Sequence, residues 1–399
     1  MTTNRNDDLP RLPFAQQDPL DIAPELRLLQ EERPITRIRT ATGDVAWMIT
    51  RYDDIKALFA DRRLGRSHPH PEKAARFSDS ALLGGPFGDF DTELETSARM
   101  RRLLAPAFSA RRMQAISGRV DALVDGLLDN LSRRAPPADL HRLLSLPLPV
   151  MVICELLGVP YADHELFEEW SERAVLIDDT VASATAFQEL FSYMNQHIDG
   201  RRRQPGDDMI SNLIAAEGEG KLSNDDIAIL AAALLLAGHA STAARIDHGT
   251  VQLLANPDQL DRLRGKPALI EGAVEEIVRT FAIGDTGLPR YARSDIEIGD
   301  VVIKTGDAVF LAATVANRDE RVFPSASDFD INREPNLHLG FGHGYYFCCG
   351  ASLARVELQS VFSKLFQRFP ALRLAVPLEH LQLRTDLLTG GFVELPVMW

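Results

Sequence analysis

The stretch HLGFGHGYYFCCGASLARVEL, residues 338–358, holds two of the three cysteines of this 399-residue chain side by side. Cys348 and Cys349 follow a segment dense in glycine and aromatic residues, and the apolar spacing after residue 350 predicts a helix. A thiol at a helix N-terminus meets unpaired backbone N–H groups, which favour the thiolate form. We therefore expect Cys348 to serve as an anionic ligand or as a nucleophile.

Such a thiolate has three chemical uses. A catalytic nucleophile needs an activating base, and His338 and His343 are candidates, but this role leaves the glycines unexplained. A zinc site needs spaced ligands, and adjacent cysteines do not easily reach one tetrahedral metal. An axial ligand of haem iron fits a glycine-rich backbone that lies flat against a porphyrin. Two small buried hydrophobic side chains are the structural alternative, which the surrounding glycines disfavour.

The loop resembles the haem-binding segment of the cytochrome P-450 superfamily, F-G-x-G-x-H/R-x-C-x-G, and ASLAR continues its bacterial form. The segment contains Phe341, Gly342, His343, Gly344, Tyr346, Cys348 and Gly350. The resemblance implies that Cys348 is the axial thiolate of haem b (iron protoporphyrin IX) and that Cys349 packs beside it. Tyr346 stands where the family has histidine or arginine, and its hydroxyl can still donate a hydrogen bond to a haem propionate.

The rest of the chain predicts a mainly α fold with a smaller β portion. VAWMITRY (45–52) has the composition of a strand, and from residue 97 to about 280 apolar residues recur at helical spacing. The helix that begins after Ser223 is apolar all round, which predicts a buried central helix. Short strands follow residue 285. We expect one domain over 1–399, and the resemblance implies a cytochrome P-450 fold with haem between the central helix and the helix after the cysteine loop.

Composition narrows the class of protein. The formal net charge of −14 argues against a nucleic-acid partner, and an odd number of cysteines fits a reducing, cytoplasmic location. The N-terminal arm, residues 1–25, is polar and proline-rich, so we expect no membrane anchor. Residues 66–96 lack sustained periodicity and predict a long loop, which we expect on the substrate side.

Further motifs extend the resemblance, which is strongest from about residue 230 to 360. Glu276 and Arg279 in EEIVR lie three apart on one helix face, and Arg333 falls where the family places the third member of a structural ionic network. Arg290 occupies the position of an arginine that meets a haem propionate. Arg101 matches the second propionate partner, with Ser97 in place of the usual histidine four residues before it.

The central helix departs from the family at one important position. AGHAST resembles A-G-x-D/E-T-T/S, in which an acid and an alcohol relay protons and the glycine leaves room for dioxygen. Gly238 is present, but Ala240 replaces the acid and Ser241 replaces the threonine. We expect Ser241, or Thr242, to deliver protons with ordered water or a substrate hydroxyl. His239 points elsewhere on a 3.6-residue helix, so we expect it to be packed or outward-facing.

The resemblance implies a monooxygenase that inserts one oxygen atom from dioxygen into an apolar small molecule, by hydroxylation or epoxidation, to tailor a bacterial secondary metabolite such as a macrolide or polyketide. Electrons would come from ferredoxin and ferredoxin reductase. The alternatives are a haem-thiolate enzyme for coupling, desaturation or peroxide-dependent chemistry, and a non-catalytic haem protein. The expected substrate chamber is lined by Phe87, Phe90, Leu234, Ala237, Ile283, Gly284, Thr286, Leu288, Leu388 and Phe392.

Overall fold

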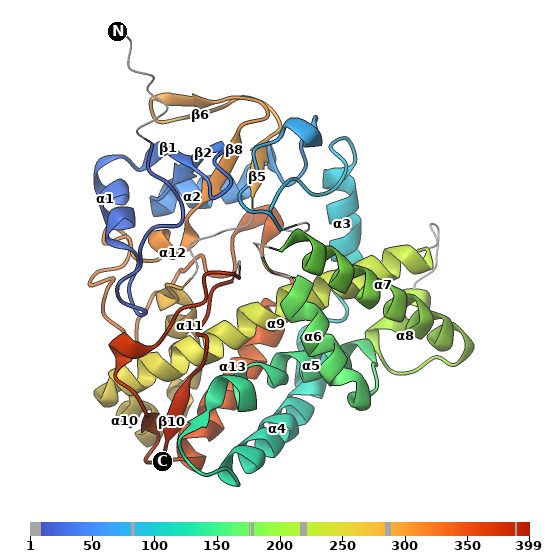
Figure 1. Cartoon of the computed structure of the whole chain (residues 1–399), viewed down its shortest axis with the longest axis vertical. Coiled ribbons are helices and arrows are strands. Elements are labelled where there is room, and N and C mark those ends of the chain that lie inside the picture. Colours follow the sequence, from blue (N-terminus) through green and yellow to red (C-terminus); the bar gives the residue numbers. More distant parts are fainter. Residues whose placement is uncertain are drawn as a thin grey trace.

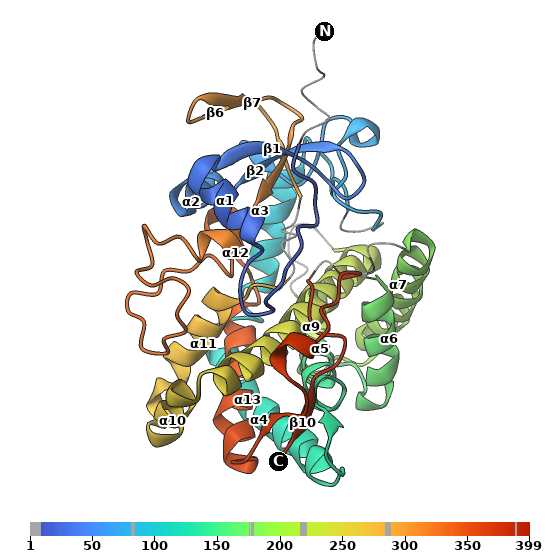
Figure 2. The same cartoon turned by 60° about the vertical axis from the view of Figure 1, so that its left-hand side comes forward.

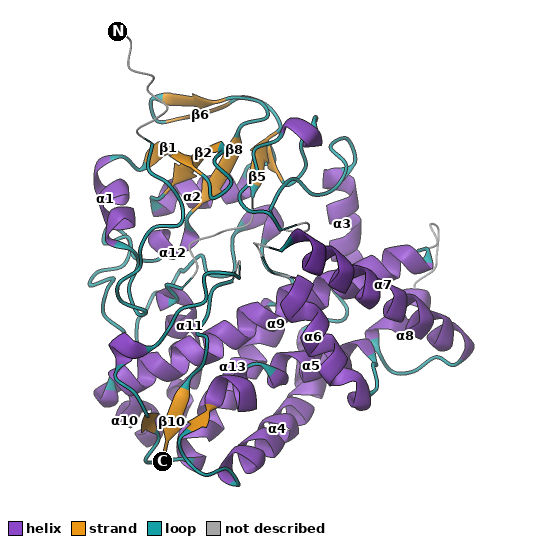
Figure 3. Cartoon of the chain, in the orientation of Figure 1, coloured by secondary structure: helices purple, strands orange, loops and turns teal. Residues whose placement is uncertain are grey.

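The computed structural model describes residues 9–80, 84–174, 176, 179–215, 222–283, 289–387 and 389–399. Helices make up most of it and the strands form small sheets (Figure 3), so the predicted mainly α class with a smaller β portion is confirmed. The helices are α1 (Pro24–Glu32), α2 (Tyr52–Ala60), α3 (Glu93–Leu104), α4 (Ala110–Ser132), α5 (Pro147–Leu157), α6 (His164–Ala174), α7 (Thr180–Arg203), α8 (Met209–Ala215), α9 (Asn224–Ala255), α10 (Pro257–Gly265), α11 (Ile270–Thr280), α12 (Ala313–Ala316) and α13 (Ala351–Arg368).

The strands form a five-stranded sheet, a three-stranded sheet and one separate hairpin. Their bounds are β1 (Ile35–Arg39), β2 (Val45–Ile49), β3 (Leu64–Gly65), β4 (Ala138–Asp139), β5 (Arg290–Ala292), β6 (Ile296–Ile298), β7 (Val301–Ile303), β8 (Ala308–Leu311), β9 (Arg373–Leu374) and β10 (Pro396–Met398). The large sheet has the order β1-β2-β8-β5-β3, in which only the β2–β8 pair is parallel. The strand expected over 45–52 ends at Ile49, because α2 already begins at Tyr52.

The central helix α9 begins with a capping box, in which Ser223 and Asp226 satisfy each other's backbone N–H groups. It crosses the helical part of the molecule and contacts α5, α6 and α7 as well as α11 and α13 (Figure 1). Among the described residues α9 is long and apolar enough to cross a membrane by length and composition. However, 61% of its most apolar window is buried in the fold, as expected for the core helix that the sequence predicts.

Two layers of structure frame the cysteine loop. The largest hydrophobic core lies among the helices, and two smaller cores lie around the five-stranded sheet. In Figure 2 the sheet and its helices α1 and α2 lie above the helical part, and α9, α11 and α13 cross below them. The loop enters α13 from the sheet side, since its short helical turn Gly344–Tyr346 contacts α2. The loop therefore lies where the two parts of the molecule meet.

Candidate active site

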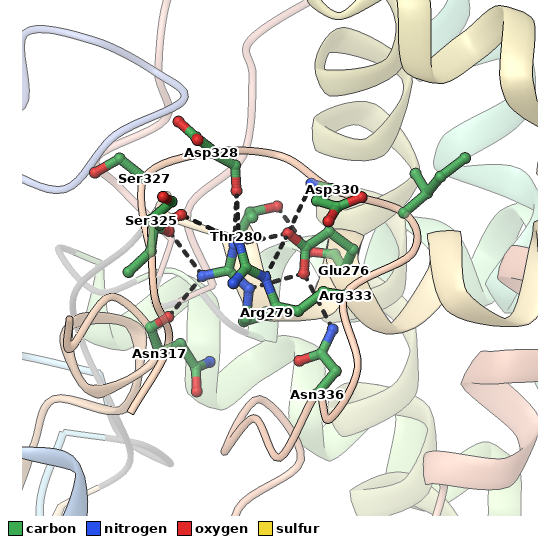
Figure 4. Close-up of polar contacts among 12 residues, drawn as sticks. Glu276, Arg279, Thr280, Asn317, Ser325, Ser327, Asp328, Asp330, Arg333 and Asn336 are labelled. Atoms are coloured by element: carbon green, nitrogen blue, oxygen red, sulfur yellow. Dashed lines mark hydrogen bonds and ion pairs between the residues drawn. The ribbon is translucent and has the colours of Figure 1, made fainter. Parts of the chain in front are cut away.

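A buried ionic cluster supports the chain just before the cysteine loop (Figure 4). The structure brings together the three residues that the sequence groups: Glu276 and Arg279 on α11 form a bidentate pair at 2.7 and 2.8 Å, and Arg333 Nε lies 3.1 Å from Glu276 Oε1. The Asn336 amide and the Asp330 backbone N–H also donate to the Glu276 carboxylate, at 3.0 and 2.9 Å. The cluster ties α11 to the segment that leads into the loop.

Arg279 is satisfied at every donor. Besides its two bonds to Glu276, it donates to the carbonyl oxygens of Asn317, Ala326 and Asp328 at 2.8–2.9 Å, so its five N–H groups have five acceptors. Both side chains of the pair are fully buried. A buried charge is tolerated only when it is paired and hydrogen-bonded, and this pair meets that condition.

The cysteine loop has a fixed path with defined glycine positions. Leu339 N–H donates to the side-chain oxygen of Asn317 at 2.7 Å, which links the loop to the ionic cluster. Gly342 (φ +71°) and Gly344 (φ +63°) adopt the left-handed backbone that other residues rarely take. A Cβ on Gly344 would lie 2.7 Å from Ala60 Cα of α2. The glycine at 344 is therefore required by the contact with α2. This reason differs from the one expected from the sequence, which is a backbone that lies flat against a porphyrin.

Cys348 lies two residues before Gly350, the N-cap of α13, and both Cys348 and Cys349 are exposed. Close protein surroundings desolvate the Cys348 thiol and raise its pKa, and Cys349 adds to this rise. The Gly350 N–H and the charges of Arg245 and Arg101 lower the pKa but do not outweigh burial. The expectation that the helix N-terminus favours the thiolate is therefore wrong for the chain by itself, because burial outweighs the hydrogen bond from Gly350.

Three arginines gather around Tyr346 in the loop. The guanidinium carbons of Arg66 and Arg290 lie 5.1 and 5.0 Å from the centre of the Tyr346 ring. Arg101 of α3 donates to the carbonyl oxygen of Phe347. Arg101 and Arg290 are predicted from the sequence as the two propionate partners, and both lie at this loop in the structure.

Burial lowers the pKa of two of these arginines. Burial, together with the neighbouring charge of Arg66, lowers the pKa of Arg290 to about 9. Burial also lowers the pKa of Arg66, whose buried Nε has no hydrogen-bond partner among the described residues. Within the described part of the chain, neither Arg66 nor Arg101 forms an ion pair with a carboxylate. The guanidinium of Arg66 thus keeps a hydrogen-bond donor and a positive charge that an anion bound at the loop can neutralise.

Glu93 of α3, a carboxylate beside these arginines, already accepts several hydrogen bonds within the chain. It accepts hydrogen bonds from the hydroxyls of Ser67 and Tyr346, from the backbone N–H groups of Arg66 and Ser67, and from Arg293. Burial raises the pKa of Glu93, but the bonds from Ser67 and Tyr346 outweigh it and the net direction is down. The Tyr346 hydroxyl therefore donates to Glu93 in this structure, and its hydrogen bond to a haem propionate stays a prediction.

One stripe of α9 is less buried than the rest of the helix. It contains Ala237, Ala240, Ser241 and Arg245, whereas Thr242 is buried on another face. The Ser241 hydroxyl donates to the Ala237 carbonyl oxygen at 2.7 Å, and Arg245 donates to the Ser241 carbonyl oxygen at 2.8 Å. Of the two alcohols considered in the sequence, Ser241 is therefore the one placed with Ala240.

Of the two residues between Ala237 and Ala240, His239 is buried and Gly238 is partly buried. His239 is fully buried, with its ring nitrogens at the Ser171 hydroxyl and at the Leu146 carbonyl oxygen, 3.0 Å away; the packed histidine is one of the two expected outcomes. Gly238 has its closest neighbour in α5, since a Cβ there would lie 3.2 Å from Ile153 Cδ1. The glycine thus allows close packing of α9 on α5, and the expectation that it leaves room for dioxygen stays a prediction.

A small cavity opens beside Ala240. Its walls are α9, the short helical turn His141–Ser145, α6 and the C-terminal segment 384–392. The lining residues include Ala240, Ala243 and Ala244 with His141, Glu172, Arg384 and Phe392. Of the expected substrate-chamber residues, Phe392 lies on this cavity.

The other described residues of the expected substrate chamber do not line this cavity. Phe87 is 55% exposed, and Phe90 lies 4.1 Å beneath the guanidinium of Arg293, so neither lines the cavity. Leu234 and Ile283 belong to the main hydrophobic core. Gly284, Thr286, Leu288 and Leu388 lie outside the described residues. The sequence analysis missed Arg66, Glu93 and His141, because each stands alone among residues that carry no motif.

Comparisons with known proteins show the family of the chain. A family model described as cytochrome P-450 matches residues 268–379, which contain the ionic cluster and the cysteine loop. Pentalenolactone synthase of Streptomyces exfoliatus is 49% identical over 399 residues, covering 98% of this chain and 99% of that protein. Mycinamicin IV hydroxylase/epoxidase of Micromonospora griseorubida is 38% identical over 391 residues, with 97% and 98% covered.

Solved structures share the whole fold. A substrate-free pimaricin epoxidase superposes with a TM-score of 0.90 at 40% identity, covering 98% of this chain and all of that one. A putative thioether synthase of griseoviridin tailoring gives a TM-score of 0.91 at 34% identity, with the same shares covered. The fold and the site therefore define an oxidoreductase of a class that works with a haem-thiolate cofactor. Within that class, the chain belongs to the cytochrome P-450 family.

Proposed function

We propose that this protein is a monooxygenase that inserts one oxygen atom from dioxygen into an apolar natural-product precursor, by hydroxylation or epoxidation, with Cys348 as the iron ligand of haem b. The observation that carries this proposal is that the loop with Cys348 also holds Arg66 over its Tyr346 ring, and the buried Nε of Arg66 has no hydrogen-bond partner among the described residues. The substrate class is supported by relatives named for pentalenolactone, mycinamicin IV and pimaricin.

The residues at the loop fit the chemistry of haem. Haem carries two carboxylates, and Arg66, Arg101 and Arg290 would hold them with charge-assisted hydrogen bonds. Sulfur of Cys348 would ligate the iron, and a bound cation would lower the thiol pKa that the protein alone raises. Bound haem supplies the activation of dioxygen. Phe341, Gly342, His343, Gly344 and Gly350 complete the proposed binding segment.

The chain's own part in the reaction is to shape the oxygen side and to move protons. One atom of dioxygen enters the product and the other leaves as water, which requires two protons and two electrons from outside the substrate. The side chains of Ala237 and Ala240 leave space along α9, and Ser241 offers a hydroxyl there. Ferredoxin and ferredoxin reductase are the proposed electron donors, and the cytoplasm is the proposed location.

A second candidate is an oxidation without ordinary oxygen insertion, such as coupling, desaturation or peroxide-dependent catalysis. The alanine at 240 favours it, because the acid that usually moves protons is missing, and one similar structure is a putative thioether synthase. Turnover with ferredoxin, reductase and dioxygen on a pentalenolactone or macrolide precursor distinguishes the two candidates. Hydroxylated or epoxidised product that accounts for the consumed electrons supports the first.

The ligand assignment is tested by exchanging the two neighbouring cysteines separately. Cys348→Ser should abolish the thiolate-type Soret band of the ferrous-CO complex, and Cys349→Ser should leave it in place. The two variants remove the same atom one residue apart, so each controls for the other. Loss of the band in Cys349→Ser alone would shift the ligand by one residue, and a protein that binds no haem at all would end the proposal.

A further inference from the structure

A cation lies on the less buried stripe of α9. Arg245 follows Ser241 by about one helical turn, and its Nη1 donates to the Ser241 carbonyl oxygen at 2.8 Å. The guanidinium carbon of Arg245 lies 4.5 Å from the centre of the Phe281 ring, just after α11. A cation over an aromatic face is attracted to it, so the two contacts hold the guanidinium in one place. The stripe that carries Ala240 and Ser241 therefore also carries a fixed positive charge.

Arg245 forms no ion pair with a carboxylate among the described residues. Asp247, the acid nearest to it in the sequence, lies on another side of α9, where its Oδ2 is 2.6 Å from His141 Nδ1. The buried Nε of Arg245 has no hydrogen-bond partner in the described part of the chain. His248 packs against Phe281 at 5.3 Å, and burial lowers the pKa of this histidine to about 3, so it is neutral. Because a guanidinium stays protonated in proteins, Arg245 is a cation that these neighbours do not neutralise.

Cys348 is the group on which this charge acts. Burial lowers the pKa of Arg245 to about 10, and Cys348 is the one described side chain whose charge raises it. Arg245 in turn lowers the pKa of the Cys348 thiol, although burial outweighs this effect. The contact between α9 and α13, the helix that Cys348 precedes, brings the two residues into one region. Cys348 also acts on Arg355 of α13, but the Glu275 carboxylate already pairs with that arginine at 2.6 and 2.8 Å.

We infer that Arg245 supplies a fixed positive charge that favours electron uptake at the haem bound by Cys348. The inference rests on the proposed function, in which ferredoxin is the electron donor. In this step one electron passes from reduced ferredoxin to the haem iron, ferredoxin is oxidised, and no bond forms or breaks. The acceptor becomes more negative by one charge, and a nearby cation stabilises the more negative state more strongly. Burial keeps solvent ions from screening this attraction. Arg245 acts through its charge alone and exchanges no proton or electron.

The first test is the midpoint potential of the haem-loaded protein, which needs neither substrate nor turnover. At a fixed solution potential, Arg245→Met should lower the ratio of reduced to oxidised protein about threefold to tenfold, where tenfold corresponds to 59 mV for one electron. Arg245→Lys keeps the charge and should give the wild-type ratio. Arg264→Met, which removes a cation of α10 that lies 3.4 Å from Asp261, is the control and should leave the ratio unchanged. The inference is overturned if Arg245→Met keeps the wild-type ratio, or if Arg245→Lys shifts as far as Arg245→Met.

The second test separates the charge of Arg245 from the shape of its side chain. The oxidised, haem-loaded protein is titrated with cyanide, which binds as an anion, and with imidazole, which binds as a neutral molecule. Arg245→Met should weaken cyanide binding about threefold to tenfold relative to imidazole binding, because only the anion is attracted by the cation. A variant that merely changes the shape of the site weakens both ligands alike. Equal losses of affinity for cyanide and imidazole would therefore refute the role of the charge.

A second neutral variant keeps the test decisive if Arg245→Met does not fold or hold haem. Arg245→Gln retains a polar donor at this position without the charge, and the same shift in the ratio of reduced to oxidised protein is expected; its absence sinks the inference. All variants should keep the thiolate-type Soret band of the ferrous-CO complex, because Cys348 is unchanged. If the wild type forms no oxygenated product while the ratio shifts as expected in Arg245→Met, the proposed function fails and the role of Arg245 stands.

Discussion

The two groups of buried arginines that border the cysteine loop differ in how their charge is balanced. In the ionic cluster, every N–H of Arg279 has an acceptor within the chain, and Glu276 accepts from four residues. Around Tyr346, burial lowers the pKa of Arg66 and Arg290, and the Arg66 Nε has no partner among the described residues. Arg279 is therefore fully paired within the folded chain, whereas we propose that Arg66 completes its hydrogen bonds with an anion that the chain binds.

The two groups of arginines are therefore expected to contribute differently, the ionic cluster to the stability of the fold and the arginines at Tyr346 to anion binding. A satisfied buried ion pair resists the loss of either partner, because the remaining charge would be left alone in the core. Buried cations without full compensation instead cost the folded chain free energy, which a bound anion returns as affinity. An arginine-to-methionine substitution should therefore lower the free energy of unfolding of the haem-free protein at Arg279. At Arg66 the same substitution should leave that free energy unchanged or raise it.

The largest effect is expected in the ionic cluster. Arg279→Met leaves the Glu276 carboxylate buried with only part of its donors, which should lower the free energy of unfolding by about 3–5 kcal/mol. Urea unfolding measures it. The matched control is Arg368→Met on α13, whose pair with Asp129 is half exposed and should change stability by about 0.5 kcal/mol or less. Equal effects of the two variants would contradict a structural role for the cluster.

Glu275, the neighbour of Glu276 on α11, connects the two regions and makes the connection sensitive to acid. Burial raises its pKa, but hydrogen bonds from Arg355 of α13 and from His338 at the start of the loop outweigh burial and lower the pKa to about 2. A carboxylate with a lowered pKa stabilises the fold above its unfolded value of about 4.3, and this contribution is lost as pH falls toward 2.

Glu275→Gln should therefore remove part of the acid sensitivity. We expect the wild type to lose about 2 kcal/mol more than the variant between pH 5 and pH 2.5, on the scale of hydrogen bonds to a charged group. Glu271→Gln, an exposed site in the first turn of α11, should follow the wild type. Parallel pH curves for Glu275→Gln and the wild type would show that the link to the loop is not electrostatic.

At the loop, Arg66→Met should separate haem binding from stability. Without haem, its free energy of unfolding should equal or exceed that of the wild type, because a buried uncompensated cation is removed. Haem retention, measured by transfer to an excess of apomyoglobin, should fall about fivefold to tenfold, roughly 1 kcal/mol. Arg62→Met, which removes an exposed arginine stacked on Tyr345, is the control. A clear loss of stability without haem would place Arg66 with the structural arginines.

The sequence predicts the features that depend on local pattern. The start of α9 after Ser223, its buried course and the spacing of Glu276 and Arg279 all follow from periodicity and residue type, and the structure contains each of them. Arg101 and Arg290 follow from the family motif, and both lie at the loop. Long helices and short-range pairs are thus accessible from the sequence because their partners are fixed by the helical repeat.

The features that the sequence does not predict depend on contacts between distant segments. His141 and Asp247 are 106 residues apart and meet only because the turn before α5 packs on α9. The Tyr346 hydroxyl has two possible acceptors, and only the position of α3 shows that Glu93 is the one it meets. For Cys348, the helix position indicates a lower pKa, but the desolvation that raises it comes from side chains elsewhere in the chain.

The smallest effect is expected at Tyr346. Its hydroxyl donates to Glu93 in the structure, whereas the family motif implies donation to a haem propionate. Tyr346→Phe removes the hydrogen bond to Glu93, which keeps its donors from Ser67 and Arg293. The free energy of unfolding should fall by about 1 kcal/mol, and haem retention should stay within about twofold of the wild type, because the hydroxyl is not available to a propionate. If retention instead falls as far as in Arg66→Met, the hydroxyl turns to the haem when it binds, and the arrangement implied by the motif holds in the loaded protein.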